Sequence, residues 1–441
     1  MRLLWVLCIL WAGPASSDES APLQGTVEVR RIDNALWRAT YCFDEPIENF
    51  SFTRRIKGMR ETHWRSASPG LALKYYSKGT ATLLAENGSS FTCASIDIKP
   101  FTDLPDGKDY YVFTPFSDGG ASLFTGHLEG LGYQNGSWRD VVFEATYQAL
   151  DGERVIAAEP DELGYQFVYF GAQKVVETDE AILVIDPAMP ERVRQSILAT
   201  MSKTNELLPR VFGYAPKHKY LVFMAAGNLT KDNGTSIKGG TGPHQIRFTL
   251  VGRGTIRLAE NEPLFYPKLA VHEVLHLWQN DVWSESLSTP HQWVHEGGAD
   301  AVTYEIMRLA GIYDKETYAK TWQEVETKCV KLLAVTSVHG GVEAGQNDVL
   351  YQCGAFANYL VGAALNAADP GAGILDFWKS MAAWDRETIQ LLENEELFFK
   401  TMVTLGFSVA QQQALQHFLA DKLDDPATTV VEIKRIFGLP P

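Results

Sequence analysis

The segment VHEVLHLW, residues 271–278, constrains this chain more than any other, because it places two histidines four residues apart around a glutamate. Pro267 opens a run with helical periodicity, so we expect one helix of about three and a half turns. At 3.6 residues per turn, His272 and His276 share one helical face, and Glu273 lies beside them. Neutral imidazoles at this spacing suit Zn²⁺, and a catalytic zinc takes a third protein ligand.

The second segment, WVHEGGAD, supplies that ligand. Glu296 opens another helical run, and Gly297–Gly298 would let this run approach the first helix closely. Asp300 lies one turn further on the same face, where it can accept the free ring N–H of a ligating histidine. The alternative is that both acids only stabilise a helix start through the helix dipole. We predict one zinc ion per chain, held by His272, His276 and Glu296.

These residues resemble the zinc motif of the gluzincin metallopeptidases, which include thermolysin and the alanyl- and glycyl-aminopeptidase groups. WVHEGGADAV is similar to the Trp-x-x-Glu-Gly segment of the two aminopeptidase groups, with Gly298 in place of a bulkier residue. The resemblance implies a thermolysin-like catalytic domain and a metallopeptidase activity. It also implies that Glu273 is the general base, moving a proton from water to the leaving amine.

A third segment, YQCGAFANYLV, is similar to the Tyr-x-Lys-Gly segment of the same groups. The resemblance implies that Tyr351 donates a hydrogen bond to the oxyanion. Tyr359 on the same helix is the second candidate, and either tyrosine could simply be a core residue. Cys353 replaces the lysine of the family segment, a departure that a disulfide could explain.

Aminopeptidases of this kind usually carry a Gly-rich edge strand with an acid that binds the substrate's free amine. The corresponding segment here, KGGTGPHQIRF (238–248), keeps the glycines and lacks the acid. His244 lies in this segment and is typical of a turn. Glu260 and Glu262 lie between this segment and the zinc helix, and we assign them no role in the cleft. Backbone pairing with an extended peptide is still expected. Exopeptidase and endopeptidase activity both stay open.

The 441 residues are too many for one ordinary core. Strand and turn signals fill the chain from about Gln24 to Ile185, helical periodicity begins near Asp186, and almost everything from Pro267 to Ile436 is helical. We expect an α+β multidomain fold. Its parts are a signal peptide (1–17), a β-rich domain like an antiparallel sandwich (18–185), a thermolysin-like α/β zinc domain (186–310) and a helical C-terminal region (311–441).

The N-terminal segment MRLLWVLCILWAGPASS has the pattern of a signal peptide, with cleavage after Ser17. It is too short to span a bilayer of ~30 Å comfortably, and no later segment is apolar enough. We therefore expect a secreted or periplasmic protein. Four cysteines remain after cleavage, and proximity favours the pairs Cys42–Cys93 and Cys329–Cys353 among three pairings, with free buried thiols as the alternative.

The formal net charge of −15 argues against a nucleic-acid partner, because no basic run exists to neutralise phosphates. A peptide or protein substrate is expected instead. The favoured function is a secreted zinc metallopeptidase, aminopeptidase-like. A zinc hydrolase with a non-peptide substrate and an inactive zinc-stabilised binding protein on the same scaffold are the alternatives.

Overall fold

The computed structural model describes most of the chain and divides it into two compact units. One unit comprises Met1–Phe113 and Phe124–Asp151, and the other comprises Thr114–Leu123 and Gly152–Pro441. The described residues are 21–56, 58–76, 79–102, 110–158, 165–214, 219–230, 234–242, 244–282, 292–384 and 392–440. The expected signal peptide therefore lies outside them. No described helix is long and apolar enough to cross a membrane.

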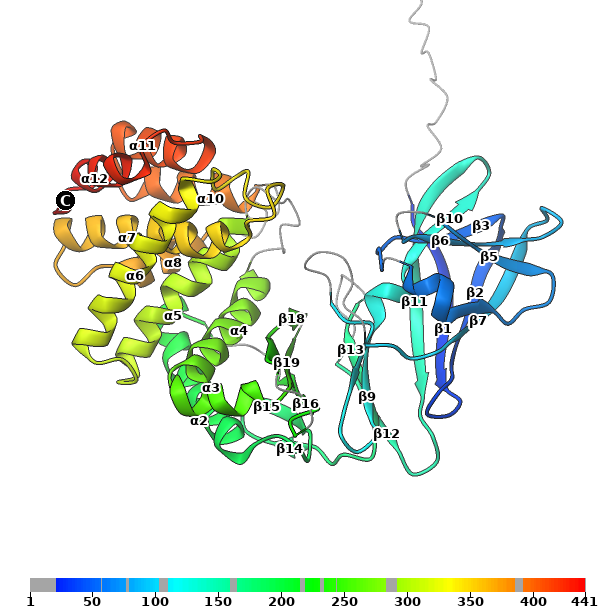
Figure 1. Ribbon diagram of the computed structural model, residues 1–441. Helices are drawn as coiled ribbons and strands as arrows, with labels where there is room; N and C mark the ends of the chain where they lie inside the picture. Colours follow the sequence, from blue (N-terminus) through cyan, green and yellow to red (C-terminus); the bar gives the residue numbers. More distant parts are fainter. Residues whose placement is uncertain are drawn as a thin grey trace, which may run out of the picture. The chain divides into compact units, whose positions relative to one another are not determined.

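The first unit contains a nine-stranded sheet (Figure 1). Along β1 buried and exposed residues alternate, as expected for a strand with one face on a core. Its order is β4-β7-β2-β1-β11-β10-β3-β6-β5. The bounds are β1 (Leu23–Arg31), β2 (Trp37–Ile47), β3 (Asn49–Phe52), β4 (Trp64–Ser66), β5 (Leu71–Tyr75), β6 (Ala81–Ala85), β7 (Phe91–Ile98), β10 (Gly130–Gln134) and β11 (Ser137–Gln148).

The sheet is mixed, which corrects the expectation of a purely antiparallel domain. β1 and β11 pair in parallel, whereas β1 and β2 pair antiparallel. Parallel neighbours require a long crossover connection, and most of the unit lies in the chain between these two strands. The predicted disulfide Cys42–Cys93 is present, and it joins directly opposed residues of β2 and β7.

The second unit begins with two smaller sheets. A four-stranded sheet has the order β12-β13-β9-β8, from β8 (Phe113–Pro115), β9 (Ala121–Phe124), β12 (Arg154–Ile156) and β13 (Phe167–Gly171). A six-stranded sheet has the order β14-β15-β16-β19-β17, with β18 beside β19. Its bounds are β14 (Val176–Glu177), β15 (Ala181–Ile185), β16 (Tyr220–Gly227), β17 (Ser236–Lys238), β18 (Thr241–Gly242) and β19 (Gln245–Val251).

β15, β16 and β19 are parallel, and β16 is almost wholly buried. Such apolar strands are stable when helices cover the sheet. The helix predicted after Asp186 is α2 (Glu191–Phe212), which begins after Pro190 and ends at Gly213 in the left-handed conformation. It crosses from β15 to β16 as a βαβ connection.

The rest of the second unit is helical, as the sequence predicts from Pro267 to Ile436. One core of apolar side chains joins α2 and the parallel strands to these helices. The bounds are α3 (Gly254–Asn261), α4 (Phe265–Val282), η3 (Trp293–Gly297), α5 (Gly298–Leu309), α6 (Lys315–Leu333), α7 (Asp348–Ala368), α8 (Ile374–Ala382), α10 (Asn394–Thr404), α11 (Val409–Ala420) and α12 (Pro426–Ile436). The domain boundaries at residues 185 and 310 stay predictions.

Candidate metal centre

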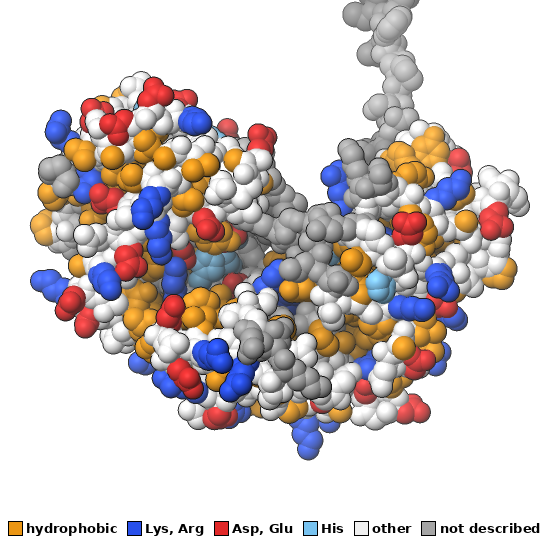
Figure 2. All heavy atoms as spheres, in the orientation of Figure 1, with side chains coloured by type: hydrophobic (Ala, Val, Ile, Leu, Met, Phe, Trp, Pro, Cys, Tyr) orange, Lys and Arg blue, Asp and Glu red, His pale blue; other side chains and the backbone are white. Residues whose placement is uncertain are grey.

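Helix α4 presents the two histidines as its periodicity predicts. Their Nε2 atoms are 2.9 Å apart, and both side chains are buried. The helix begins at Phe265, so Pro267 lies in its first turn, where a missing backbone N–H costs no helical hydrogen bond. His272 and His276 keep 8% and 6% of their surface exposed, so the cluster is not sealed from solvent; Figure 2 shows histidine side chains at the surface of the second unit.

Glu296 completes the cluster from a different local structure than expected. It lies in η3, a single π-helical turn directly before α5, and not at an α-helix start. Such turns widen the helix and occur often at functional sites. Glu296 Oε2 lies 3.4 Å from Nε2 of His272 and 3.4 Å from Nε2 of His276.

These distances fit zinc. Four ligands at about 2.0–2.1 Å around a tetrahedral ion are separated by about 3.3 Å. The three candidate atoms, which all lie within 4.8 Å of one another, match the edges of one face of that tetrahedron. The donor set of two imidazoles and one carboxylate also suits Zn²⁺.

Asp300 fixes the ring of His272. Its Oδ1 lies 3.0 Å from Nδ1 of His272, and its Oδ2 lies 3.3 Å from Nζ of Lys268. Burial raises the pKa of Asp300, but the charges of Lys268 and His272 outweigh it, so the pKa is lowered and the carboxylate is ionised. An ionised Asp300 accepts the Nδ1–H of His272 and leaves Nε2 directed to the cluster.

The pKa shifts of the cluster follow from its negative charge. Burial lowers the pKa of His272, but hydrogen bonds with Asp300 and Glu296 outweigh it and raise the pKa to about 10. Burial likewise raises the pKa of Glu296, while both histidines lower it to well below its usual range. The three carboxylates, including Glu273, therefore form a site that attracts a cation.

Gln279 fixes the ring of His276, and the sequence reading missed it. Its Oε1 lies 2.7 Å from Nδ1 of His276, and its Nε2 donates to the backbone oxygen of His295 at 3.0 Å. The ring of His295 stacks on that of His276 with centroids 4.2 Å apart. Gln279 thereby links the zinc helix to η3. Its position three residues after His276, on the same helical face, is a sequence pattern from which this contact could have been predicted.

Residues of the Gly-rich segment hold the side chain of Glu273 in place. Thr241 donates from Oγ1 to Glu273 Oε2 at 2.9 Å and also contacts the backbone oxygen of Glu273 at 3.0 Å. Gly239 packs so closely on the same side chain that a Cβ atom there would overlap it. Sequence reasoning identified this segment by its glycines but did not single out Thr241, because its pairing with α4 is set by tertiary structure.

Tyr351 lies at the cluster, and Tyr359 does not. The ring of Tyr351 stacks beside that of His272 with centroids 6.0 Å apart. Burial, and then the charge of Glu296, raise the pKa of Tyr351 well above its ordinary value, so its hydroxyl keeps its proton. Tyr359 packs on Trp322 with centroids 4.7 Å apart, which makes it a core residue.

Comparison with known proteins rests on structure. No protein-family model and no curated protein matches the sequence. An aminopeptidase N family protein from Idiomarina loihiensis superposes with a TM-score of 0.63 at 14% identity, covering 93% of this chain and 78% of that one. The chain has the fold of the M1 zinc metallopeptidases.

Two further solved structures share the M1 fold. Yeast LTA4 hydrolase in complex with bestatin gives a TM-score of 0.51 at 10% identity, covering 91% of this chain and 68% of that one. An M1 zinc metallopeptidase from Deinococcus radiodurans, a mutant bound to a Tyr-Ser-Ala substrate, gives 0.50 at 12% identity, covering 91% and 94%. The resemblance read from the motifs is confirmed at the level of the fold.

The glycine pair acts elsewhere than expected. Gly297 packs against the backbone of Gly354 in α7, and Gly298 packs against the ring of Trp378 in α8. A Cβ atom at either position would overlap its neighbour. The pair therefore brings η3 and the start of α5 close to α7 and α8, so the tight packing that it permits is with these helices and not with α4. In the M1 fold of this chain, this contact places the Tyr351 helix beside the Glu296 turn.

Several histidines and tryptophans of the second unit lie in structural surroundings, away from the three proposed ligand atoms. His244 has a φ of 51° in the turn between β18 and β19, as expected for a turn histidine. His339 lies 2.9 Å from Glu395, which also accepts from Trp293 Nε1 at 2.6 Å. Trp278 and Trp293 are buried. Glu260 lies in α3, and Glu262 follows that helix.

Proposed function

We propose that this chain is a zinc-dependent metallopeptidase that hydrolyses peptide bonds, aminopeptidase-like in its scaffold. The observation that carries the proposal is the cluster of His272, His276 and Glu296 on an M1 fold, with Glu273 beside it. Intact Glu273 favours an enzyme over a binding protein, because a purely structural zinc site does not need a base there.

In this proposal each residue has one role. A zinc ion bound by His272, His276 and Glu296 would polarise the substrate carbonyl and lower the pKa of a water molecule. Glu273 takes the proton of the attacking water on its carboxylate and gives it to the leaving amine. Tyr351 keeps its proton and donates a hydrogen bond to the carbonyl oxygen as negative charge develops there.

The substrate's backbone would lie along the Gly-rich segment. β17 and β18 both pair with β19, so their other sides form an edge beside Glu273. An extended peptide can add to such an edge through main-chain hydrogen bonds. The segment 238–248 has no acid, so the proposal assigns it no clamp for a free amine.

Export of the protein belongs to the same proposal. The disulfide pairs Cys42–Cys93 and Cys329–Cys353 are both formed, which favours an oxidising compartment. Together with the signal-like residues 1–17, they support a secreted or periplasmic enzyme acting on peptide or protein substrates. The net charge of −15 argues against a nucleic-acid partner.

The test combines zinc content with hydrolysis of a panel of peptides and aminoacyl amides. Glu273→Gln should keep the zinc and lose roughly 10²–10⁴-fold in rate, because only proton transfer is removed. His276→Ala should lose the zinc. Tyr351→Phe should cost about 10²–10³-fold with little change in affinity. A chelator should abolish activity, and added Zn²⁺ should restore it.

Two outcomes would replace the proposal. Zinc-dependent turnover of esters or other non-peptide substrates, with none of peptides, would favour the non-peptide hydrolase. Bound zinc with no turnover across the panel would favour the zinc-stabilised binding protein. Wild-type peptide hydrolysis by a zinc-loaded Glu273→Gln variant would contradict the mechanism itself.

A further inference from the structure

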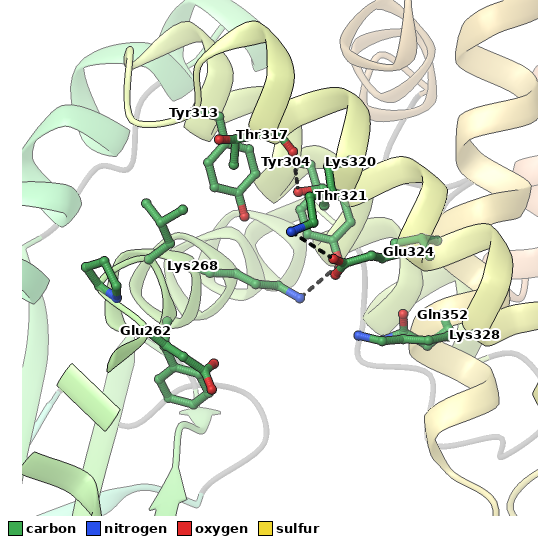
Figure 3. Close-up of a pocket in the computed structure, with 14 residues that line it drawn as sticks. Glu262, Lys268, Tyr304, Tyr313, Thr317, Lys320, Thr321, Glu324, Lys328 and Gln352 are labelled. Carbon is green, nitrogen blue, oxygen red and sulfur yellow. Dashed lines mark hydrogen bonds and ion pairs between the residues drawn. The ribbon is translucent and has the colours of Figure 1, made fainter. Parts of the chain in front are cut away.

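A second feature of the catalytic unit is a pocket of about 600 Å³ next to the metal cluster (Figure 3). Its walls come from the loop before α4, from α4 itself, and from α5, α6 and α7. Three lysines, two glutamates and several hydroxyl groups line it. Pro263, Leu264, Phe265 and Val325 supply an apolar part of the lining, so the pocket combines apolar surface with a few charged and polar groups that can orient a ligand.

One wall of the pocket is connected to the metal cluster through a single chain of contacts. Lys268 lies one turn before His272 on α4 and donates to Tyr304 at 2.9 Å. Its Nζ is 3.3 Å from Asp300, whose other oxygen holds the His272 ring. The pocket therefore adjoins the metal cluster on the His272 side.

The opposite wall is held in place by a disulfide. Cys329–Cys353 joins α6 to α7 with a Cα–Cα distance of 4.8 Å. Lys328 and Gln352 immediately precede these cysteines, and both line the pocket. Gln352 in turn follows Tyr351, the proposed oxyanion donor. The cross-link thus holds together the parts of α6 and α7 that carry Lys328 and Gln352.

The charges in the pocket favour an anion between the two walls. Figure 3 shows the amines of Lys268 and Lys328 pointing toward each other across the pocket. Like charges that face each other in this way are stabilised by a negative group between them. In the described part of the chain, Lys328 and Gln352 have no hydrogen-bond or ion-pair partner of their own.

The glutamates of the lining do not remove this preference. Glu324 lies 3.9 Å from Lys320 and forms an ion pair with it. Glu262 is exposed on the far side of Lys268, away from Lys328 in Figure 3. The side-chain amide of Gln352 and the ammonium group of Lys328 can both donate hydrogen bonds. Together they are suitable donors for one carboxylate.

We propose that this pocket binds a carboxylate of the peptide substrate between Lys268 and Lys328, next to the metal centre. The inference rests on the proposed function and deepens it, because it names the substrate class: peptides with a negative charge close to the scissile bond. A peptide offers such a carboxylate either at its C-terminus or on an aspartate or glutamate side chain. The proposal makes Lys328 a specificity-determining residue.

The test measures binding and turnover with matched peptides. Short peptides are prepared with a free C-terminal carboxylate or a C-terminal amide, and with Glu or Gln beside the scissile bond. Their affinity for zinc-loaded Glu273→Gln protein is measured by calorimetry, and kcat/KM is measured with the protein of native sequence. The carboxylate form should bind about tenfold more tightly than its neutral counterpart, as expected for hydrogen bonds to a charged group.

Variants assign the preference to the pocket. Lys328→Gln should remove the preference by raising KM for carboxylate substrates, and Lys328→Arg should retain it. Lys331→Gln, an exposed lysine on the same helix outside the pocket, should change neither.

Each result decides between the possibilities. A preference for the free C-terminus or for Glu identifies the source of the carboxylate, and its loss in Lys328→Gln supports the proposal. Equal binding of charged and neutral peptides overturns it, as does a preference that survives Lys328→Gln. Hydrolysis of every peptide without preference would overturn the pocket assignment and leave the proposed function standing. Carboxylate-selective binding without any turnover would instead contradict the proposed function alone.

Discussion

His272 and His276 are oriented by partners of different charge. Asp300 holds His272 through an ionised carboxylate, and Gln279 holds His276 through a neutral amide. A carboxylate partner raises the basicity of the ligating imidazole more than an amide does. The acidic partner therefore contributes more to the proposed zinc affinity.

Asp300→Asn should lower zinc affinity by roughly 10–100-fold while the fold is retained, because the ring of His272 loses its charged acceptor. Competition with a chelating dye measures this affinity directly. Asp179→Asn, which makes the same change at an exposed position, should bind zinc like the unaltered protein. Unchanged affinity in Asp300→Asn would remove Asp300 from the metal site.

Thr241→Val should lower kcat by about tenfold with zinc content unchanged, because the hydrogen bond that fixes Glu273 is worth about 1.5 kcal/mol for a charged acceptor. Thr249→Val on β19 is the matched control. Its buried hydroxyl has no hydrogen-bond partner in the described residues, so its removal should not lower kcat. Peptide hydrolysis under saturating substrate measures both variants. Equal rates in the two would mean that Thr241 does not position Glu273.

At the scale of elements, η3 and α7 are in close backbone contact at the site. Gly297 and Gly354 bring two backbones together where either side chain would clash, and Gly354 lies three residues from Tyr351. The distance between the proposed zinc ligand on η3 and the proposed oxyanion donor on α7 thus depends on two glycines. Interiors this closely packed transmit small volume changes as displacements.

Gly354→Ala should destabilise the protein by about 1–3 kcal/mol, because its Cβ atom would meet the backbone oxygen of Trp293 at 2.6 Å. It should also reduce turnover by moving α7 away from η3. Gly373→Ala, where nothing lies within 4 Å of the added atom, should change neither. Thermal unfolding together with hydrolysis distinguishes the two variants. Unaltered stability of Gly354→Ala would show that the backbones of η3 and α7 are not in close contact.

At the scale of the whole molecule, every residue of the proposed site belongs to the second compact unit. The zinc helix, η3, α7 and the Gly-rich segment all lie within Gly152–Pro441. One hydrophobic core unites the parallel strands and the helices of this unit. The C-terminal helices therefore stabilise the catalytic arrangement directly, since α7 supplies Tyr351.

The mature protein should begin at Asp18 and contain both disulfides. Cleavage after Ser17 removes the apolar leader, and an oxidising compartment keeps Cys42–Cys93 and Cys329–Cys353 closed. N-terminal sequencing of the exported protein and peptide mapping without reductant measure these two properties. A protein that retains Met1, or that carries free thiols at these cysteines, would contradict export.

Local interactions determined what the sequence could predict. The alignment of His272 with His276 follows from helical geometry, and the ends of α2 follow from Pro190 and Gly213. The buried strand β16 was predictable from its continuous apolar run, and β19 from its alternation of apolar and polar residues. Each of these depends on residues within a few positions of one another, where spacing translates directly into geometry.

Tertiary structure alone decided the remaining features. The close packing of Gly297 against Gly354 and the hydrogen bond from Thr241 to Glu273 both join segments that are distant in the chain. The π-helical turn that carries Glu296 takes part in the first of these contacts. The pairing of β1 with β11 is equally non-local. Such contacts arise when hydrophobic burial selects one packing of the whole unit, and a pattern along the chain does not encode which distant backbones will meet.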